Sequence, residues 1–227
     1  MSSSRLFAGL ICILLAQIAS AGTLITFSDP GLVIFESEHG IQGYYVATEK
    51  GKTCDFFIFQ APGSAWKDIG GDGRSIEVNT FSLEIGQFQY EQRNSIYDTR
   101  GKINKNQDEW TMRTNVEPPG CGGGVGVFSR SGKIPDYRYF ENKKIQATGI
   151  RVVRKKTILH NEIDGRYIKR SGYLTQDDIV ALVETRDGFS YVRYFDPDYF
   201  SESVGKVTTG WVHTADLVDP FPPAAEH

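Results

Sequence analysis

The sequence predicts a mainly β protein. Three observations lead to this prediction: short runs rich in Val, Ile, Tyr and Phe recur along the chain, clusters of Gly, Asn, Asp and Pro separate them, and long helical periodicity is almost absent. We expect an N-terminal β domain that a disulfide staples together, followed by a smaller C-terminal β unit. The length fits two small domains better than one.

The expected strands of the first part lie between turn signals. They cover residues 32–36, 44–47, 54–60, 76–81, 87–90, 109–113 and 125–128. The segment from Gly132 to Lys144 is polar and aromatic, and β patterning resumes at Ile150. We therefore place the domain boundary near residue 145, with domains over 22–144 and 145–220 and a disordered tail over 221–227.

The first 21 residues have the pattern of a secretory signal peptide. Arg5 precedes an apolar stretch over residues 6–18, and Ala19-Ser20-Ala21 forms a small-x-small cleavage site. The stretch is shorter than the roughly 20 residues that span a bilayer, so we predict no membrane span. A lipoprotein anchor at Cys12 is the alternative, although small residues do not precede this cysteine. We expect a periplasmic or secreted protein.

Cleavage at this site leaves two cysteines, Cys54 and Cys121. An even number of cysteines in an oxidising compartment favours a disulfide, and two buried free thiols are the alternative. The chain has no Cys-x-x-Cys pair for thiol exchange. We therefore interpret the pair as a structural link that holds the loop around Cys121 on the strand that begins at Cys54.

The charge distribution argues against nucleic acid as a partner. The net charge is −3, and Lys and Arg are scattered along the chain. One basic cluster covers residues 151–156, with Lys143 and Lys144 before it. We interpret it as the solvated side of a strand, and a patch for an anionic ligand is the alternative.

The C-terminal third contains an ordered set of short motifs. They are an opening strand over 150–153, a long loop through residues 164–167, Tyr173-Leu174 with a polar turn, a strand over 179–184, a turn at 186–188, a strand over 189–194, and Gly210-Trp211-Val212 before Asp216-Leu217. This order resembles the bacterial SH3-like domain family, and the resemblance implies an SH3-like β-barrel over residues 145–220. Phe189 stands where that family usually has a tryptophan, and the loop over 196–201 is longer than usual.

Strand alternation in this region separates two faces. Val180, Leu182 and Val192 share one face, while aromatic and basic side chains share the other. The second face can offer stacking area to sugar rings or to a peptide, and simple packing of these rings is the alternative. The candidate binding residues are Phe189, Tyr191, Arg193 and Trp211.

The sequence contains no recognisable catalytic motif. Exported SH3-like domains often accompany cell-wall cysteine peptidases, but Cys54 lies in a strand and has a disulfide partner, and His39 is the one histidine of the first domain. Gly-x-Ser-x-Gly, His-Glu-x-x-His and Walker motifs are missing. Asp68 and Asp72 loosely suggest a calcium loop, but Gly70 takes the middle ligand position. We predict no enzyme, no cofactor and no metal.

The first domain is rich in aromatic residues near its cysteines: Tyr44-Tyr45, three phenylalanines in the strand that begins at Cys54, and Trp110 shortly before Cys121. This composition resembles that of periplasmic lysozyme inhibitors and immunity-like proteins. Our hypothesis is a binding protein that neutralises a wall-degrading enzyme or toxin through two polar loops, over residues 68–74 and 104–109, which makes Asp68 and Asp72 candidate binding residues. A peptidoglycan-binding or envelope scaffold module is the first alternative. A wall hydrolase with an unrecognised site is the second.

Overall fold

The computed structural model describes residues 21–122, 126, 128, 136–199 and 202–223. The predicted signal peptide lies outside these residues, apart from Ala21. Sixteen strands and three short 3-10 helices make up the described secondary structure, which confirms the mainly β prediction. In the described part of the chain, no helix combines the length and the apolar character needed to cross a membrane.

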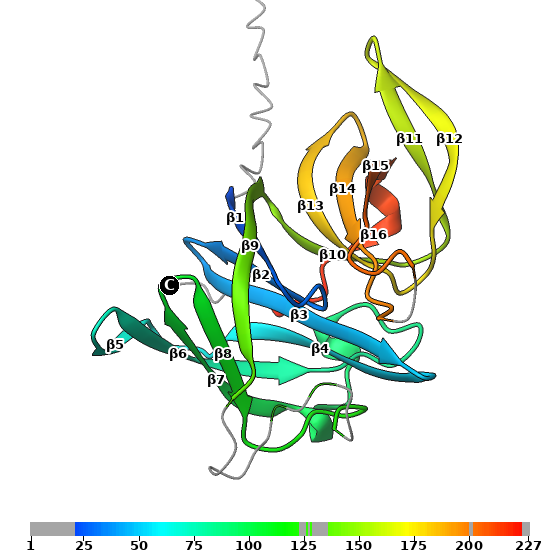
Figure 1. Cartoon of the computed structure of the whole chain (residues 1–227). Helices are drawn as coiled ribbons and strands as arrows, with labels where there is room; N and C mark the ends of the chain where they lie inside the picture. Colours follow the sequence, from blue (N-terminus) through cyan, green and yellow to red (C-terminus); the bar gives the residue numbers. More distant parts are fainter. Residues whose placement is uncertain (1–20, 123–125, 127, 129–135, 200–201, 224–227) are drawn as a thin grey trace, which may run out of the picture.

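Eight antiparallel strands form a closed barrel in which each strand follows its neighbour in the chain (Figure 1). The ring closes because β9 pairs with β1 and β4 pairs with β6, while β5 adds a short hairpin to β6. The barrel strands and β5 are β1 (Gly22–Phe27), β2 (Leu32–Ser37), β3 (Gly40–Glu49), β4 (Lys52–Gln60), β5 (Lys67–Gly70), β6 (Gly73–Phe81), β7 (Thr99–Asn106), β8 (Glu109–Thr114) and β9 (Arg138–Ala147).

Alternate residues of these strands fill the barrel interior, as the period of two in a strand requires. Ile34, Tyr45 and Ile58 point inward, and Trp110 is 1% exposed at the centre of a ring cluster with Phe27. Side chains can fill the interior of a barrel of eight strands. The inward-facing side chains that the structure describes form one buried cluster, which is the core of the barrel.

A disulfide joins Cys54 of β4 to Cys121 in the segment after β8, which confirms the predicted pair and excludes free thiols. Cys54 is fully buried in the barrel core, and Cys121 packs against the same cluster. The bond therefore holds the segment that follows β8 on the barrel wall.

The C-terminal part forms a second, half-barrel sheet with the strand order β12-β11-β15-β14-β13-β10-β16. Its core is aliphatic and includes Val153, Leu159 and Val192. The chain passes from the first sheet to the second at Thr148. The elements are β10 (Gly149–Val153), β11 (Thr157–Ile163), β12 (Arg166–Leu174), β13 (Ile179–Arg186), β14 (Phe189–Phe195), β15 (Val207–His213), η3 (Thr214–Asp216) and β16 (Leu217–Val218).

The two sheets share an apolar interface on the outside of the barrel. The barrel residues between the inward-facing ones, among them Val33, Phe35 and Phe57, pack with Ile150 and Ala181 of the second sheet. Strands such as β2 are therefore buried on both faces. The half-barrel sheet covers this side of the barrel (Figure 1).

Phe221 corrects the prediction of a disordered tail that begins at this residue. Its side chain is 5% exposed and contacts Phe57 and Phe81 edge to face, at centroid distances of 5.7 and 6.2 Å. Burial of an aromatic ring in the interface offsets the entropy lost when the chain end is ordered. Residues 224–227 lie outside the described residues.

Three expected local structures differ from the observed ones. Residues 87–90 form a loop that enters the 3-10 helix η1 (Tyr90–Gln92), followed by η2 (Ser95–Tyr97). The polar segment between Gly132 and Lys144 contains most of β9, which closes the barrel. The loop expected around Asp164 is the turn of the β11–β12 hairpin. Of the expected strand at 125–128, only Gly126 and Phe128 are described, and neither lies in a strand.

Candidate functional site

One end of the barrel, which we call the barrel mouth, is closed by Trp66 from the loop between β4 and β5. The Trp66 ring meets Trp110 edge to face, with 6.0 Å between centroids. The Arg74 guanidinium lies 4.2 Å from the centre of the Trp66 ring, and the Lys105 ammonium lies 4.4 Å from the centre of the Trp110 ring. Cations over tryptophan faces are stabilising, so two ring–cation pairs fix this end of the barrel.

Glu141 links these cations at the barrel mouth. Its carboxylate lies 2.9 Å from Lys105 Nζ and 2.7 Å from Lys144 Nζ, and it accepts a 2.9 Å hydrogen bond from Trp110 Nε1. Burial by itself would raise the pKa of Glu141, but the bonds from Lys144, Lys105 and Trp110 lower it to about 2. The carboxylate is therefore charged at neutral pH and is held from three sides.

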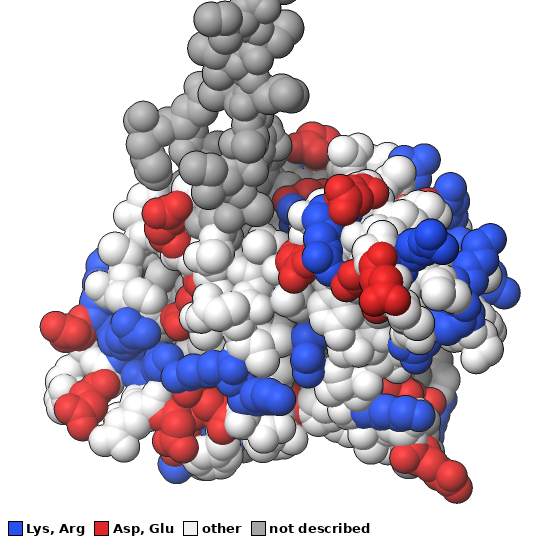
Figure 2. Space-filling view, turned by 90° about the horizontal axis from the view of Figure 1, so that it is seen from above, with Lys and Arg blue, Asp and Glu red and all other residues white. Residues whose placement is uncertain are grey.

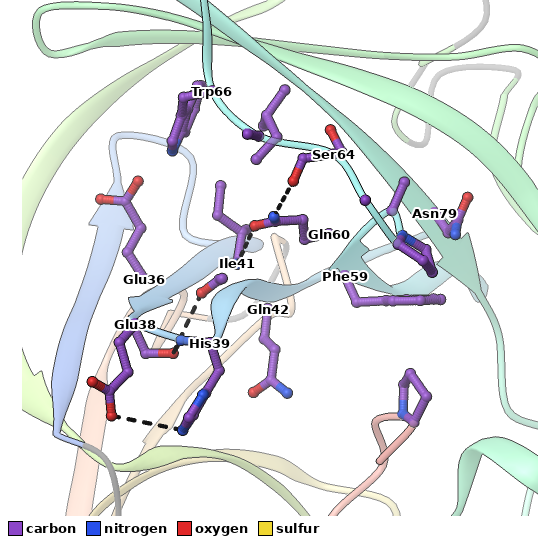
Figure 3. Close-up of a pocket in the computed structure, with 18 of the residues that line it drawn as sticks. Glu36, Glu38, His39, Ile41, Gln42, Phe59, Gln60, Ser64, Trp66 and Asn79 are labelled. Atoms are coloured by element: carbon purple, nitrogen blue, oxygen red, sulfur yellow. Dashed lines mark hydrogen bonds and ion pairs between the residues drawn. The ribbon is translucent and has the colours of Figure 1, made fainter. Parts of the chain in front are cut away.

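A cavity of about 720 Å³ adjoins the barrel mouth (Figure 3). Glu36 and Trp66 lie at one end of it, and His39 and Gln42 lie at the other (Figure 3). The Gln60 amide is already used, because it accepts from the Ile41 N–H at 3.3 Å and donates to the Ser64 carbonyl. The lining thus combines carboxylate, amide and aromatic groups.

The two polar loops predicted as binding elements lie side by side next to this cavity. The first is the β5–β6 hairpin, in which Asp68 pairs with Arg74, and the second is the β7–β8 turn. Gln107 Nε2 donates a 3.0 Å hydrogen bond to Asp72 Oδ2 and joins the two turns. Gln107 also has φ of 56°, in the region that glycine favours. We call this pair of turns, residues 67–74 and 104–109, the rim.

The half-barrel sheet brings together three of its four predicted binding residues. Tyr191 and Trp211 lie 5.3 Å apart in register on β14 and β15, and Phe189 follows on the same face. Tyr167 of the β11–β12 hairpin stacks on Phe189 at 3.9 Å and contacts Trp211 at 5.3 Å. The opposite face carries Val180 and the other aliphatic residues of the core, as strand alternation predicted.

Arg193 does not join this aromatic cluster. It pairs with Thr209 further along the same face, and the cation over Trp211 is Arg186, 4.7 Å from the ring centre. Trp211 is only 6% exposed, so its ring mainly supports the hairpin, while Phe189 and Tyr191 are partly exposed. The accessible part of the cluster is a shallow stacking surface.

Several residues of both sites were not identified as candidates from the sequence. Trp66, Lys105 and Glu141 come from separate strands and loops and meet only because the barrel closes. Tyr167 stands in a stretch expected to be a loop, where the adjacent Tyr167 and Ile168, both residue types that strands favour, were the available signal. The aromatic residues of adjacent strands were predictable because their pairing is local.

Among the described residues, no group of three or more His, Cys, Asp or Glu side chains is placed to hold a metal ion. Asp68 and Asp72 belong to the exposed rim, and Asp72 accepts from an amide. The chemistry that both sites offer is hydrogen bonding, charge pairing and ring stacking.

The chain was compared with protein families, curated proteins and solved structures. No protein-family model, no curated protein and no solved structure matches this chain.

Proposed function

We propose that the protein is an exported binding protein that neutralises a cell-wall-degrading enzyme through the rim. The observation that carries the proposal is the Gln107–Asp72 hydrogen bond, which joins two exposed turns on a closed barrel. The Cys54–Cys121 disulfide is consistent with export, because such bonds persist in oxidising compartments.

The physical basis is preorganisation of the rim. Binding costs less when the contacting loops are already ordered, and each turn here extends from paired strands of a closed sheet. Lys67, Asp68 and Ile69 are all exposed at the rim and offer a cation, a carboxylate and an apolar side chain to a partner. Insertion of these groups into an enzyme cleft blocks it without any chemical step.

The C-terminal sheet supports a second part of the proposal, an SH3-like domain. Its hairpin β11–β12 precedes a three-strand meander, then the 3-10 turn η3, and β16 returns to pair with β10. This order agrees with the resemblance read from Tyr173-Leu174 and Gly210-Trp211-Val212. In this proposal the SH3-like domain holds the barrel close to the wall-degrading enzyme that the barrel binds.

The test is a peptidoglycan turbidity assay with the chain from Gly22 to His227 and a panel of lysozymes and wall amidases. We expect protection against one enzyme, and Asp72→Ala and Gln107→Ala should weaken it roughly tenfold, because a lost hydrogen bond loosens the rim. Glu202→Ala, an exposed change on the second sheet, is the matched control. Lysis by the protein alone would contradict the proposal.

Binding to peptidoglycan through the half-barrel sheet is the second candidate. The favouring observation is the partial exposure of Phe189 and Tyr191, since aromatic side chains bind sugar rings at small entropic cost. Sedimentation with purified sacculi measures it, and Tyr191→Ala should reduce the bound fraction. Equal sedimentation of the variant and the parent would exclude this surface.

A further inference from the structure

Positive charge is concentrated in one segment of an acidic chain. Residues 154–173 contain six Lys and Arg against two acidic residues, while the whole chain carries a net charge of −3. This segment forms the β11–β12 hairpin and the turn before it. Figure 2 shows Lys and Arg side chains gathered on that side of the molecule.

The cations of the hairpin differ from those of the barrel in their pairing. Lys105 and Lys144 of the barrel both meet Glu141 within 3 Å. Within the described residues, Arg166 and Lys169 have no carboxylate within ion-pair distance, and Arg170 donates to the Thr209 carbonyl at 2.9 Å, which leaves its charge uncompensated. The hairpin therefore presents a positive potential to its surroundings.

The same hairpin exposes apolar side chains on its outward face. Ile163 and Ile168 are 50% and 49% exposed. Ile163 pairs with Arg166, and Ile168 pairs with Asn161 two residues along β11, so both isoleucines share a face with Arg166. The opposite face carries Tyr167, which stacks on Phe189, and Lys169, which lies two residues further along β12. The packing of the inward face leaves the outward face free for a partner.

We propose that this outward face, which we call the basic hairpin face, binds the surface of an anionic lipid bilayer. Unpaired cations contact lipid phosphates, and isoleucines enter the boundary between headgroups and acyl chains, where apolar burial adds to the charge attraction. A soluble polyanion would use the cations and leave Ile163 and Ile168 in water. The pairing of both side-chain types on one face favours the bilayer.

The experiment is co-sedimentation of the chain from Gly22 to His227 with vesicles, since this chain contains both sheets and lacks the apolar leader. Vesicles of phosphatidylglycerol in phosphatidylcholine are compared with vesicles of phosphatidylcholine alone, at low and high salt. We expect binding to the anionic vesicles only, with affinity falling as salt rises.

Two variants separate the roles of charge and apolar area. The double change Arg166→Gln and Arg170→Gln should weaken vesicle binding roughly 25-fold, at about fivefold for each charge. The double change Ile163→Ser and Ile168→Ser should weaken it roughly tenfold. The control, Lys67→Gln with Ile69→Ser on the rim, removes the same side-chain types from exposed positions and should leave vesicle binding unchanged.

Two results would overturn the proposal. If the isoleucine variant bound the vesicles as tightly as the parent and the parent bound polyglutamate equally well, the partner would be a soluble polyanion. If the control lost as much binding as the hairpin variants, the contact would be nonspecific. Circular dichroism of each variant verifies the fold. The rim control shows whether vesicle binding is independent of the rim, which carries the proposed inhibition.

Discussion

The closed barrel and the half-barrel sheet both bury a β core, but they do so in different ways. Every barrel strand has a neighbour on both sides, whereas β12 and β16 leave two edges in the second sheet. The barrel encloses a ring-rich core of its own, and the second sheet has a smaller aliphatic core and also packs on the barrel. Closure thus pairs every barrel strand on both sides, while the second sheet keeps two strand edges that closure does not protect.

The difference extends to the two candidate sites. At the barrel mouth, the β7–β8 turn joins strands that are paired on both sides, and the Gln107–Asp72 hydrogen bond ties the β5–β6 hairpin to this turn. In the second sheet, the hairpin has one registered pair with β15, His160 with Trp211, and the stack of Tyr167 on Phe189 adds to it. We therefore expect the rim to be rigid and the hairpin to move more readily.

The largest expected effect is on the barrel core. Trp110→Ala removes a side chain that is 1% exposed, together with its contacts to Trp66, Lys105 and Glu141. The variant should lose about 4 kcal/mol of unfolding free energy, as large-to-small changes in filled cores do. Urea denaturation followed by circular dichroism measures it. Ile69→Ala, at a 56% exposed position, should change stability by less than about 0.5 kcal/mol.

An intermediate effect concerns the charge network of the barrel mouth. The folded pKa of Glu141 is about 2, below the ordinary value of 4.5, so its contribution is fully present above pH 5 and is lost as pH falls towards 2. This contribution is on the order of 2–3 kcal/mol. The stability difference between the parent and Glu141→Gln should therefore shrink between pH 5 and pH 2. A difference independent of pH would show that the network adds nothing.

The smallest effect is expected at the hairpin of the second sheet. Tyr167→Ala removes the stack on Phe189 and should cost about 1 kcal/mol, the typical value of an aromatic pair. Hydrogen exchange of the β11 and β12 amides should accelerate while the barrel amides stay protected. Tyr167→Phe keeps the ring and should behave like the parent. Equal acceleration in both sheets would contradict the contrast between the two units.

Sequence patterns predicted the elements with local signals. The strands around Ile34, Ile58, Val180 and Val192 were found because short runs rich in β-branched and aromatic residues stand there between turn residues. The disulfide followed from the even cysteine count that remains after the predicted signal peptide. The predictions at these positions needed no information about distant contacts.

The remaining elements depend on contacts between distant residues. β9 contains many charged and polar residues and has weak strand character, yet it pairs with β1, more than 100 residues earlier, because the barrel must close. Lys105 and Glu141 meet for the same reason. Phe221 stands among prolines near the end of the chain, and the local sequence does not show that its ring is buried in the interface between the two sheets. Such arrangements follow from tertiary packing, which overrides local preference.

The apolar outer wall of the barrel limits how the chain can be divided. Val33, Phe35 and Phe57 face the second sheet, and Phe221 crosses back to cover two of the barrel's phenylalanines. An isolated barrel would expose this wall as an apolar surface, and such surfaces promote aggregation. The two units are therefore not interchangeable modules, and a change in either has to preserve the surface that the other one covers.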